Sequence, residues 1–246
     1  MKARTLVAAL AALLVAFASA APGAAQSMDI DLTGADGAML KATYTSPGQP
    51  GPAMLLIHQC NMDRHSWDSI AGGLVDAGVH VLTMDLRGFG DSEGEPLAGA
   101  EGFRNLMMKS PGDLDLAYDY LVGKDGVDGS RVAVGGASCG AMLTADLASR
   151  HEGITSLMLL SGPPSDAAIA HIAATPSLGV FGAAASGDTI TPGVADVISR
   201  AVDGSGNEKS MAKVYEGTEH GLPMFEANPE LQPLLLDWLK NELLSN

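Results

Sequence analysis

One short segment restricts the fold of this chain more than any other part of it. Residues 131–143 read RVAVGGASCGAML, so a Gly-x-Ser-x-Gly pattern around Ser138 joins a short apolar run to a helix-like run. Such an apolar run is typical of a buried strand, and the flanking glycines let strand and helix approach closely at a sharp turn. The serine hydroxyl would then stand clear of a sheet, above the N-terminus of a helix. The pattern and its context predict a nucleophile elbow.

Apolar runs alternate with helix-like segments along most of the chain. Residues 28–45 alternate loosely between apolar and polar and predict an edge hairpin. Strands are further predicted at 53–58, 79–85, 131–136, 154–160, 177–183 and 211–215, and helices at 66–77, 113–122, 139–150, 194–202 and 230–244. This order predicts an α/β domain with a mostly parallel central sheet and helices on both faces. The stretch between Ser161 and Ser177 is too short for a helical cap, so we expect an open cleft.

The first 25 residues have the pattern of a secretory signal peptide. Two basic residues precede an apolar run over 6–17, which is too short for a comfortable membrane span. Small residues follow, and they fit cleavage after Ala20 or after Ala25. We expect cleavage after Ala25 and a single domain over residues 26–246, with an uncleaved anchor helix as the alternative. The predicted location is therefore secreted or periplasmic.

The chain is strongly acidic. Its 14 Lys and Arg residues stand against 29 Asp and Glu residues, for a net charge of −15. This excess of negative charge disfavours nucleic acid and anionic membrane surfaces as partners. The two cysteines lie far apart and flank no histidine pair, so neither a metal nor an organic cofactor is expected. We expect a monomer that acts on a small molecule and has no membrane partner once the leader is removed.

Three blocks of sequence together resemble one known family. They are LLIHQC at residues 55–60, DLRGFGDS at residues 85–92, and the predicted turn at Ser138. The chain resembles the α/β-hydrolase superfamily and is most similar to its small, lidless serine hydrolases of the dienelactone-hydrolase type. The resemblance implies the α/β-hydrolase fold, with an N-terminal edge hairpin and no large cap domain.

The resemblance also implies a chain order of serine, then acid, then histidine. Ser138 is the predicted nucleophile, Asp188 lies in a turn-rich loop after the strand at 177–183, and His220 follows the last strand. A serine hydroxyl needs an imidazole to take its proton, and the carboxylate fixes the imidazole's tautomer. Asp203 is the nearest competing acid, but it lies beyond a helix.

The predicted oxyanion hole uses backbone N–H groups of Cys139, which follows the nucleophile, and of Cys60 in the His-x-x turn. Gln59 stands where the commoner family pattern has glycine. The sequence leaves open whether the Gln59 side chain enters the pocket. Gln59, Met108 and Met224 are predicted to contact substrate, with core packing as the alternative for the methionines. The cleft walls are expected from loops at 59–66, 88–110, 162–172 and 221–227.

Three polar residues of the matching blocks are expected to support turns rather than chemistry. His58 should form hydrogen bonds below the oxyanion turn. Asp85 and Arg87 should hold the turn that follows their strand.

The only two cysteines of the chain fall on the two predicted oxyanion residues, Cys60 and Cys139. Two N–H groups aimed at one oxygen should bring their Cα atoms to about 5–7 Å, which overlaps the range of disulfides. Disulfides persist in the compartments that exported proteins reach. We therefore predict a Cys60–Cys139 disulfide, with two buried free thiols as the alternative.

These features give one leading hypothesis for function and two alternatives. The leading hypothesis is a serine hydrolase that cleaves a small ester or lactone through an acyl-enzyme intermediate. A peptidase or amidase would use the same three residues. A non-catalytic binding protein on the same fold is the other alternative, although the intact Ser, Asp and His set argues against it.

Overall fold

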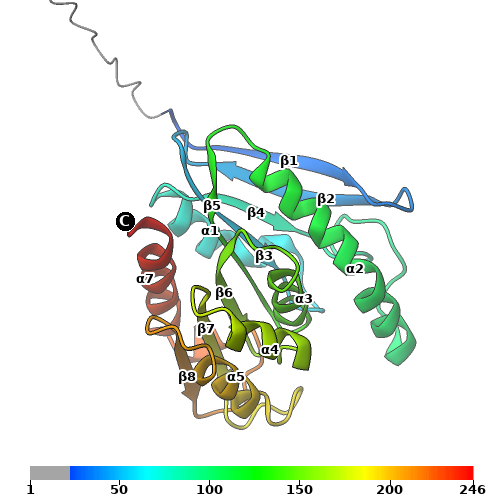
Figure 1. The fold of residues 1–246 in the computed structure, drawn as a ribbon. Coiled ribbons are helices and arrows are strands. Elements are labelled where there is room, and N and C mark those ends of the chain that lie inside the picture. The colour runs from blue at the N-terminus through cyan, green and yellow to red at the C-terminus, as the bar shows by residue number, and fades with distance from the viewer. Residues whose placement is uncertain (1–22, 246) are drawn as a thin grey trace, which may run out of the picture.

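The computed structural model describes residues 23–245, so the predicted signal peptide lies outside the described residues except for its last three positions. Eight strands form one sheet in the order β1-β2-β4-β3-β5-β6-β7-β8 (Figure 1). The strands are β1 (Gln26–Thr33), β2 (Met39–Ser46), β3 (Gly51–Ile57), β4 (His80–Met84), β5 (Val127–Ala137), β6 (Ile154–Leu160), β7 (Gly179–Ala185) and β8 (Met211–Tyr215).

The sheet is parallel except at one edge. Neighbouring strands from β4 through β3, β5, β6 and β7 to β8 all pair in parallel. β1 and β2 form the predicted antiparallel hairpin, and β2 joins the rest of the sheet by an antiparallel pairing with β4. Every residue of β3 and β7 is buried, as expected for central strands that are covered on both faces.

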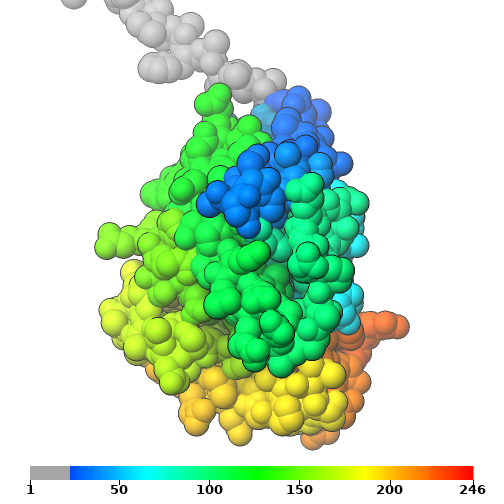
Figure 2. Space-filling model, turned by 90° about the vertical axis from the view of Figure 1, so that its right-hand side faces the viewer, coloured from blue at the N-terminus to red at the C-terminus, as the bar shows by residue number. Residues whose placement is uncertain are grey.

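Helices cover both faces of the sheet (Figure 1). Apolar side chains of α2, α3, α4 and α5 pack in one core cluster, and those of α1, α6 and α7 pack in a second cluster on the other face. In the side view of Figure 2, the green segment that contains α2 forms the outer surface below the blue hairpin. The helices are α1 (Asp68–Val75), preceded by the 3-10 turn η1 (Arg64–Trp67), α2 (Gly99–Val122), α3 (Cys139–Ala148), α4 (Asp166–Ala174), α5 (Val194–Asp203), α6 (Met224–Ala227) and α7 (Leu231–Leu244).

The largest departure from the predicted elements is α2. The sequence predicted a helix over residues 113–122, whereas α2 begins at Gly99 and continues through Pro111. Proline lacks the N–H that an interior helical position donates, so a helix is normally expected to start near it rather than to pass through it. Burial of Leu106, Leu114 and Leu121 along one side of α2 stabilises the longer helix despite this loss.

No large cap covers the sheet. Between β6 and β7 the chain forms only α4, which has nine residues. None of the helices in the described part of the chain is both long enough and apolar enough to cross a membrane. Because no cap is present, the carboxyl ends of the parallel strands are open, and this is the end of the sheet at which parallel α/β proteins bind their ligands.

Candidate active site

Ser138 occupies the turn between β5 and α3. Its backbone has φ 52° and ψ −121°, a conformation that residues other than glycine rarely adopt. A Cβ atom at Gly136 would lie 2.5 Å from the backbone carbon of Gly140, and one at Gly140 would lie 2.3 Å from the carbonyl oxygen of Ile57. Both positions therefore need glycine. The turn holds the Ser138 hydroxyl at the carboxyl end of the sheet, as the pattern predicted.

Three side chains from separate loops meet at this edge of the sheet. Nε2 of His220 lies 2.7 Å from Oγ of Ser138, and Nδ1 lies 2.6 Å from Oδ2 of Asp188. The other Asp188 oxygen accepts hydrogen bonds from the backbone N–H groups of Ile190 and Thr191, each at 2.9 Å. An ionised carboxylate only accepts, so it favours a proton on Nδ1 and leaves Nε2 to accept from the serine.

The competing acid and two other histidines lie elsewhere. Asp203 is the last residue of α5, and it forms no hydrogen bond or ion pair with His220. His80 contacts the Tyr44 hydroxyl at 2.7 Å, and His151 contacts a carboxylate on α2 at 2.8 Å. Among the described residues, Asp188 is thus the acid that the structure brings to His220.

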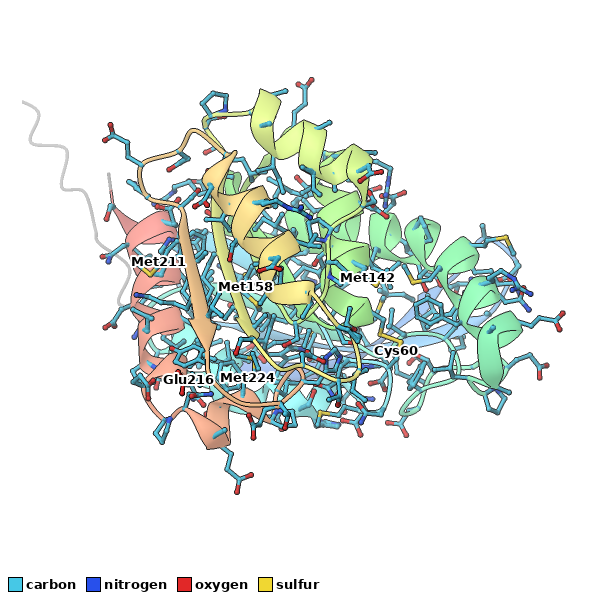
Figure 3. The ribbon with its side chains drawn as sticks, turned by 90° about the horizontal axis from the view of Figure 1, so that it is seen from below. Cys60, Met142, Met158, Met211, Glu216 and Met224 are labelled. Atoms are coloured by element: carbon cyan, nitrogen blue, oxygen red, sulfur yellow. A yellow bond between two sulfur atoms is a disulfide. The ribbon has the colours of Figure 1, made fainter. Side chains whose placement is uncertain are left out.

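Cys60 and Cys139 form a disulfide, as the sequence predicted. Their Cα atoms are 5.9 Å apart, and Figure 3 shows the yellow sulfur–sulfur bond at Cys60, where the loop after β3 meets α3. Neither backbone N–H group of the pair donates a hydrogen bond to another group within residues 23–245. Two unused donors therefore lie beside Ser138 on residues that are covalently tied together.

His58 supports the loop after β3. Its Nδ1 lies 2.8 Å from the carbonyl oxygen of Gln59, and its Nε2 accepts the backbone N–H of Leu86 at 2.9 Å. Burial lowers the pKa of His58 below its ordinary value, which favours the neutral ring. Because Nε2 accepts, Nδ1 must donate, and both ring nitrogens are used in structural hydrogen bonds as expected.

Asp85 and Arg87 hold the turn after β4, also as expected. The Asp85 carboxylate accepts the backbone N–H of Arg64 at 2.6 Å and that of Asp91 at 2.9 Å, and it forms an ion pair with the Arg64 guanidinium. Arg87 is held by two hydrogen bonds to Asp113, which raise the pKa of Arg87 further above its ordinary value. Arg64 and Arg87 are therefore both paired with carboxylates.

A pocket of about 520 Å³ opens at Ser138. Its lining residues come from the loop after β3, the nucleophile turn, the loop after β7 and the histidine loop: Gln59, Cys60, Asn61, Ser138, Thr189, Ile190, Thr218, His220 and Pro223. The predicted wall segments 88–110 and 162–172 contribute none of these residues. Thr189 and Ile190 were missed, although they follow Asp188 directly and could have been found from that position.

The methionines predicted to contact substrate do not line this pocket. Met224, labelled in Figure 3, is fully buried in the core cluster that contains the apolar side chains of α1 and α7, and its sulfur lies 3.2 Å from the Ser161 hydroxyl. Met108 is 72 % exposed on α2. Met224 therefore follows the alternative of core packing, whereas the exposed Met108 neither lines this pocket nor packs in the core. Spacing along the chain does not reveal whether a helix turns a side chain toward the core or the solvent.

Removing the disulfide should lower stability substantially. A cross-link over 79 positions reduces the entropy of the unfolded chain, and on the chain-entropy model it contributes about 4.5 kcal/mol. The Cys60→Ala/Cys139→Ala variant should therefore melt roughly 10 °C below the unmodified protein. Differential scanning calorimetry measures the shift, and reductant should bring the unmodified protein close to the variant. Equal melting temperatures in all three samples would contradict the prediction.

The described residues offer no grouping of three or more His, Cys, Asp or Glu side chains that could hold a metal ion. At the carboxyl end of the sheet, the hydroxyl of Ser138, the imidazole of His220 and the carboxylate of Asp188 form a hydrogen-bonded series. Such a series lets the imidazole take a proton from the serine while the carboxylate stabilises the resulting imidazolium.

Comparison with known proteins agrees with this architecture. An esterase of Pyrococcus furiosus superposes with a TM-score of 0.69 at 16% identity, covering 89% of this chain and 91% of the esterase. A dienelactone hydrolase-like promiscuous phosphotriesterase from metagenomic libraries superposes with a TM-score of 0.71 at 15% identity, covering 90% of this chain and all of the other. At these identities the likeness concerns the fold.

Sequence comparison extends over a shorter range. An uncharacterized protein of Mycobacterium tuberculosis is 31% identical over 143 residues, which cover 55% of this chain and 48% of that protein. The chain thus spans about half the length of the curated relatives it matches first. The family model described as alpha/beta hydrolase fold matches residues 52–180, more than half of the chain. The chain therefore belongs to the α/β-hydrolase fold family.

Proposed function

We propose that this protein is a serine hydrolase that cleaves small carboxylic esters through an acyl-enzyme intermediate. The family and the esterase-like structural neighbours support a hydrolase. The observation that carries the finer proposal is the continuous hydrogen-bonded series from Asp188 through His220 to Ser138 at an open edge of the sheet. In this proposal Ser138 is the nucleophile, His220 the general base and acid, and Asp188 the residue that orients His220.

The proposed reaction proceeds in two halves. The Ser138 oxygen attacks the ester carbonyl carbon while His220 takes the hydroxyl proton, and His220 then gives that proton to the departing alkoxide. In the second half a water molecule attacks the acyl carbon while His220 takes a proton from it. His220 then returns that proton to the departing Ser138 oxygen, and the carboxylic acid is released. The N–H groups of Cys60 and Cys139 would stabilise the negative oxygen that forms in each half, and one such donor contributes about 3 kcal/mol.

A panel of nitrophenyl esters of increasing acyl length tests this proposal directly. Turnover that varies with acyl length and saturates with ester concentration supports the proposal. The acyl length with the highest kcat/KM then measures how long an acyl group the pocket accommodates. Turnover of the matching nitroanilides but not of the esters would favour an amidase instead. No turnover of either class would favour a binding protein on the same fold.

The pocket should discriminate against anionic acyl groups. Neither Lys nor Arg appears among its lining residues, and Arg64 and Arg87 on the neighbouring loops are already paired with carboxylates. A net charge of −15 adds repulsion at longer range. We expect kcat/KM for nitrophenyl hemisuccinate to be about tenfold below that for nitrophenyl butyrate, a difference of about 1.4 kcal/mol.

Ionic strength provides the control for this prediction. At about 1 M salt the Debye length falls to about 3 Å, so the kcat/KM values of the two esters should become more similar. An equal or higher kcat/KM for the hemisuccinate at low salt would contradict the prediction.

We also propose export to the periplasm or the cell exterior, and action as a monomer on a small molecule. The Cys60–Cys139 disulfide supports an oxidising compartment, because reducing compartments keep such thiols free. N-terminal sequencing of the protein recovered from the cell exterior or periplasm tests the export and the cleavage after Ala25.

A further inference from the structure

We propose that Gln59 is a positioning residue that locks the histidine loop, residues 217–223, to the oxyanion turn, residues 58–62. This inference rests on the proposed function. The two segments come from opposite parts of the chain and must keep a fixed distance for His220 and the oxyanion donors to act on one carbonyl group. The side chain of Gln59 is the direct polar link between them.

The Gln59 side chain is buried, and both ends of its amide are bonded. It is 3 % exposed, its Oε1 accepts the backbone N–H of Leu222 at 2.8 Å, and its Nε2 donates to Oδ1 of Asn61 at 2.7 Å. Leu222 is two residues beyond His220, so this bond fixes the backbone that carries the imidazole. A buried N–H group left without an acceptor costs about 1–3 kcal/mol, which makes the bond hard to replace.

The loop passes directly over the Gln59 amide. Gly221 has φ +68°, and a Cβ atom there would lie only 2.1 Å from the Gln59 Oε1. The residue beside His220 is therefore restricted to glycine by the amide beneath it as well as by its own backbone conformation. This close approach leaves the histidine loop no space to move closer to Gln59.

The backbone of Gln59 is fixed as firmly as its side chain. Its carbonyl oxygen lies 2.8 Å from Nδ1 of His58 and accepts the N–H groups of Asn61 and Met62 at 2.8 and 3.0 Å. The next N–H along the chain belongs to Cys60, the proposed oxyanion donor held by the disulfide to Cys139. Gln59 thus connects a rigid oxyanion turn to the loop whose imidazole must reach Ser138.

An uncharged acceptor suits this position. Gln59 lines the same pocket as Ser138 and His220, so a carboxylate there would bring a negative charge toward the place where the oxyanion forms. The amide supplies the oxygen that Leu222 needs without that repulsion.

The test compares Gln59→Met, which keeps the length of the side chain but removes the acceptor, with Gln59→Glu, which keeps an acceptor. Gln232→Met is the matched control, because Gln232 is half-buried on α7 and its amide nitrogen donates to the hydroxyl of the exposed Ser69 at 2.6 Å. Active sites are counted with a fluorophosphonate, and kcat is expressed per labelled site. This normalisation removes any loss caused by misfolded protein.

We expect Gln59→Met to lower kcat per labelled site about 30-fold with KM changed less than threefold, because misplacement of a catalytic group acts mainly on the chemical step. Gln232→Met should match the unmodified protein. A kcat per site within twofold of the unmodified protein for Gln59→Met would overturn the proposal, since a merely structural role lowers the number of sites and not their rate.

Hydrogen exchange at the Leu222 amide tests the link without relying on activity. The amide should exchange at least tenfold faster in Gln59→Met, and Gln59→Glu should keep most of the protection. Equal protection in all three proteins would overturn the proposal. If the unmodified protein neither hydrolyses esters nor takes the label, the proposed function fails, and the exchange result alone decides whether Gln59 holds the loop.

Discussion

Ser138→Ala should lower kcat for nitrophenyl esters by about 10⁵-fold, because the members of such a triad act as a unit and loss of the nucleophile removes the acyl-enzyme route. The fold should persist, since alanine has the same Cβ atom as serine and adds no strain to the backbone at φ 52°, and the lost group is one partly buried hydroxyl. Steady-state kinetics and the thermal midpoint measure the two effects.

Ser161→Ala is a matched control for this substitution. Ser161 is the other non-glycine residue with positive φ among the described residues, also at 52°, and it is fully buried at the end of β6. Its hydroxyl contacts the Met224 sulfur at 3.2 Å and forms no bond to His220. We expect Ser161→Ala to keep kcat within a few-fold. Retention of more than a tenth of the activity by Ser138→Ala would contradict the assignment.

Asp188→Asn should lower kcat by about 10⁴-fold with little change in stability. The asparagine oxygen can keep the bonds from the backbone N–H groups of Ile190 and Thr191. Its amide nitrogen would then face Nδ1 of His220 and favour the tautomer that carries a proton on Nε2. That tautomer cannot accept the Ser138 proton, so the chemistry fails while the loop remains folded.

Asp203→Asn serves as the comparison for the acid. Asp203 is the competing carboxylate in the sequence, and it ends α5 away from His220. We expect this variant to retain the activity of the unmodified protein. A large loss in Asp203→Asn together with a small loss in Asp188→Asn would reverse the assignment of the acid.

The elements that were predicted well are those with strong local signals. The run around Leu55 predicted β3 because a strand covered on both faces is continuously apolar, and all seven residues of β3 are buried. The turn at Ser138 was predictable because its glycines are required by close backbone approach. The Cys60–Cys139 disulfide followed from placing both residues at one oxyanion, a geometric constraint that the resemblance supplied.

The features that were missed depend on packing between distant segments. The first half of α2 was not predicted because Pro111 is a poor helix residue, and only tertiary burial of Leu106 and Leu114 compensates for it. Met224 was predicted either to contact substrate or to pack in the core, and it lies in the core against Ser161. The role of Gln59 depends on a bond to Leu222 across 163 positions, which no local pattern reveals.

A fluorophosphonate should react covalently with the unmodified protein at Ser138 alone. We expect intact mass spectrometry to find one added phosphonyl group per chain and peptide sequencing to locate it on Ser138, with no label on Ser138→Ala. Labelling at another serine, or no labelling of folded protein whose disulfide is intact, would contradict the claim that Asp188, His220 and Ser138 form a working nucleophilic site.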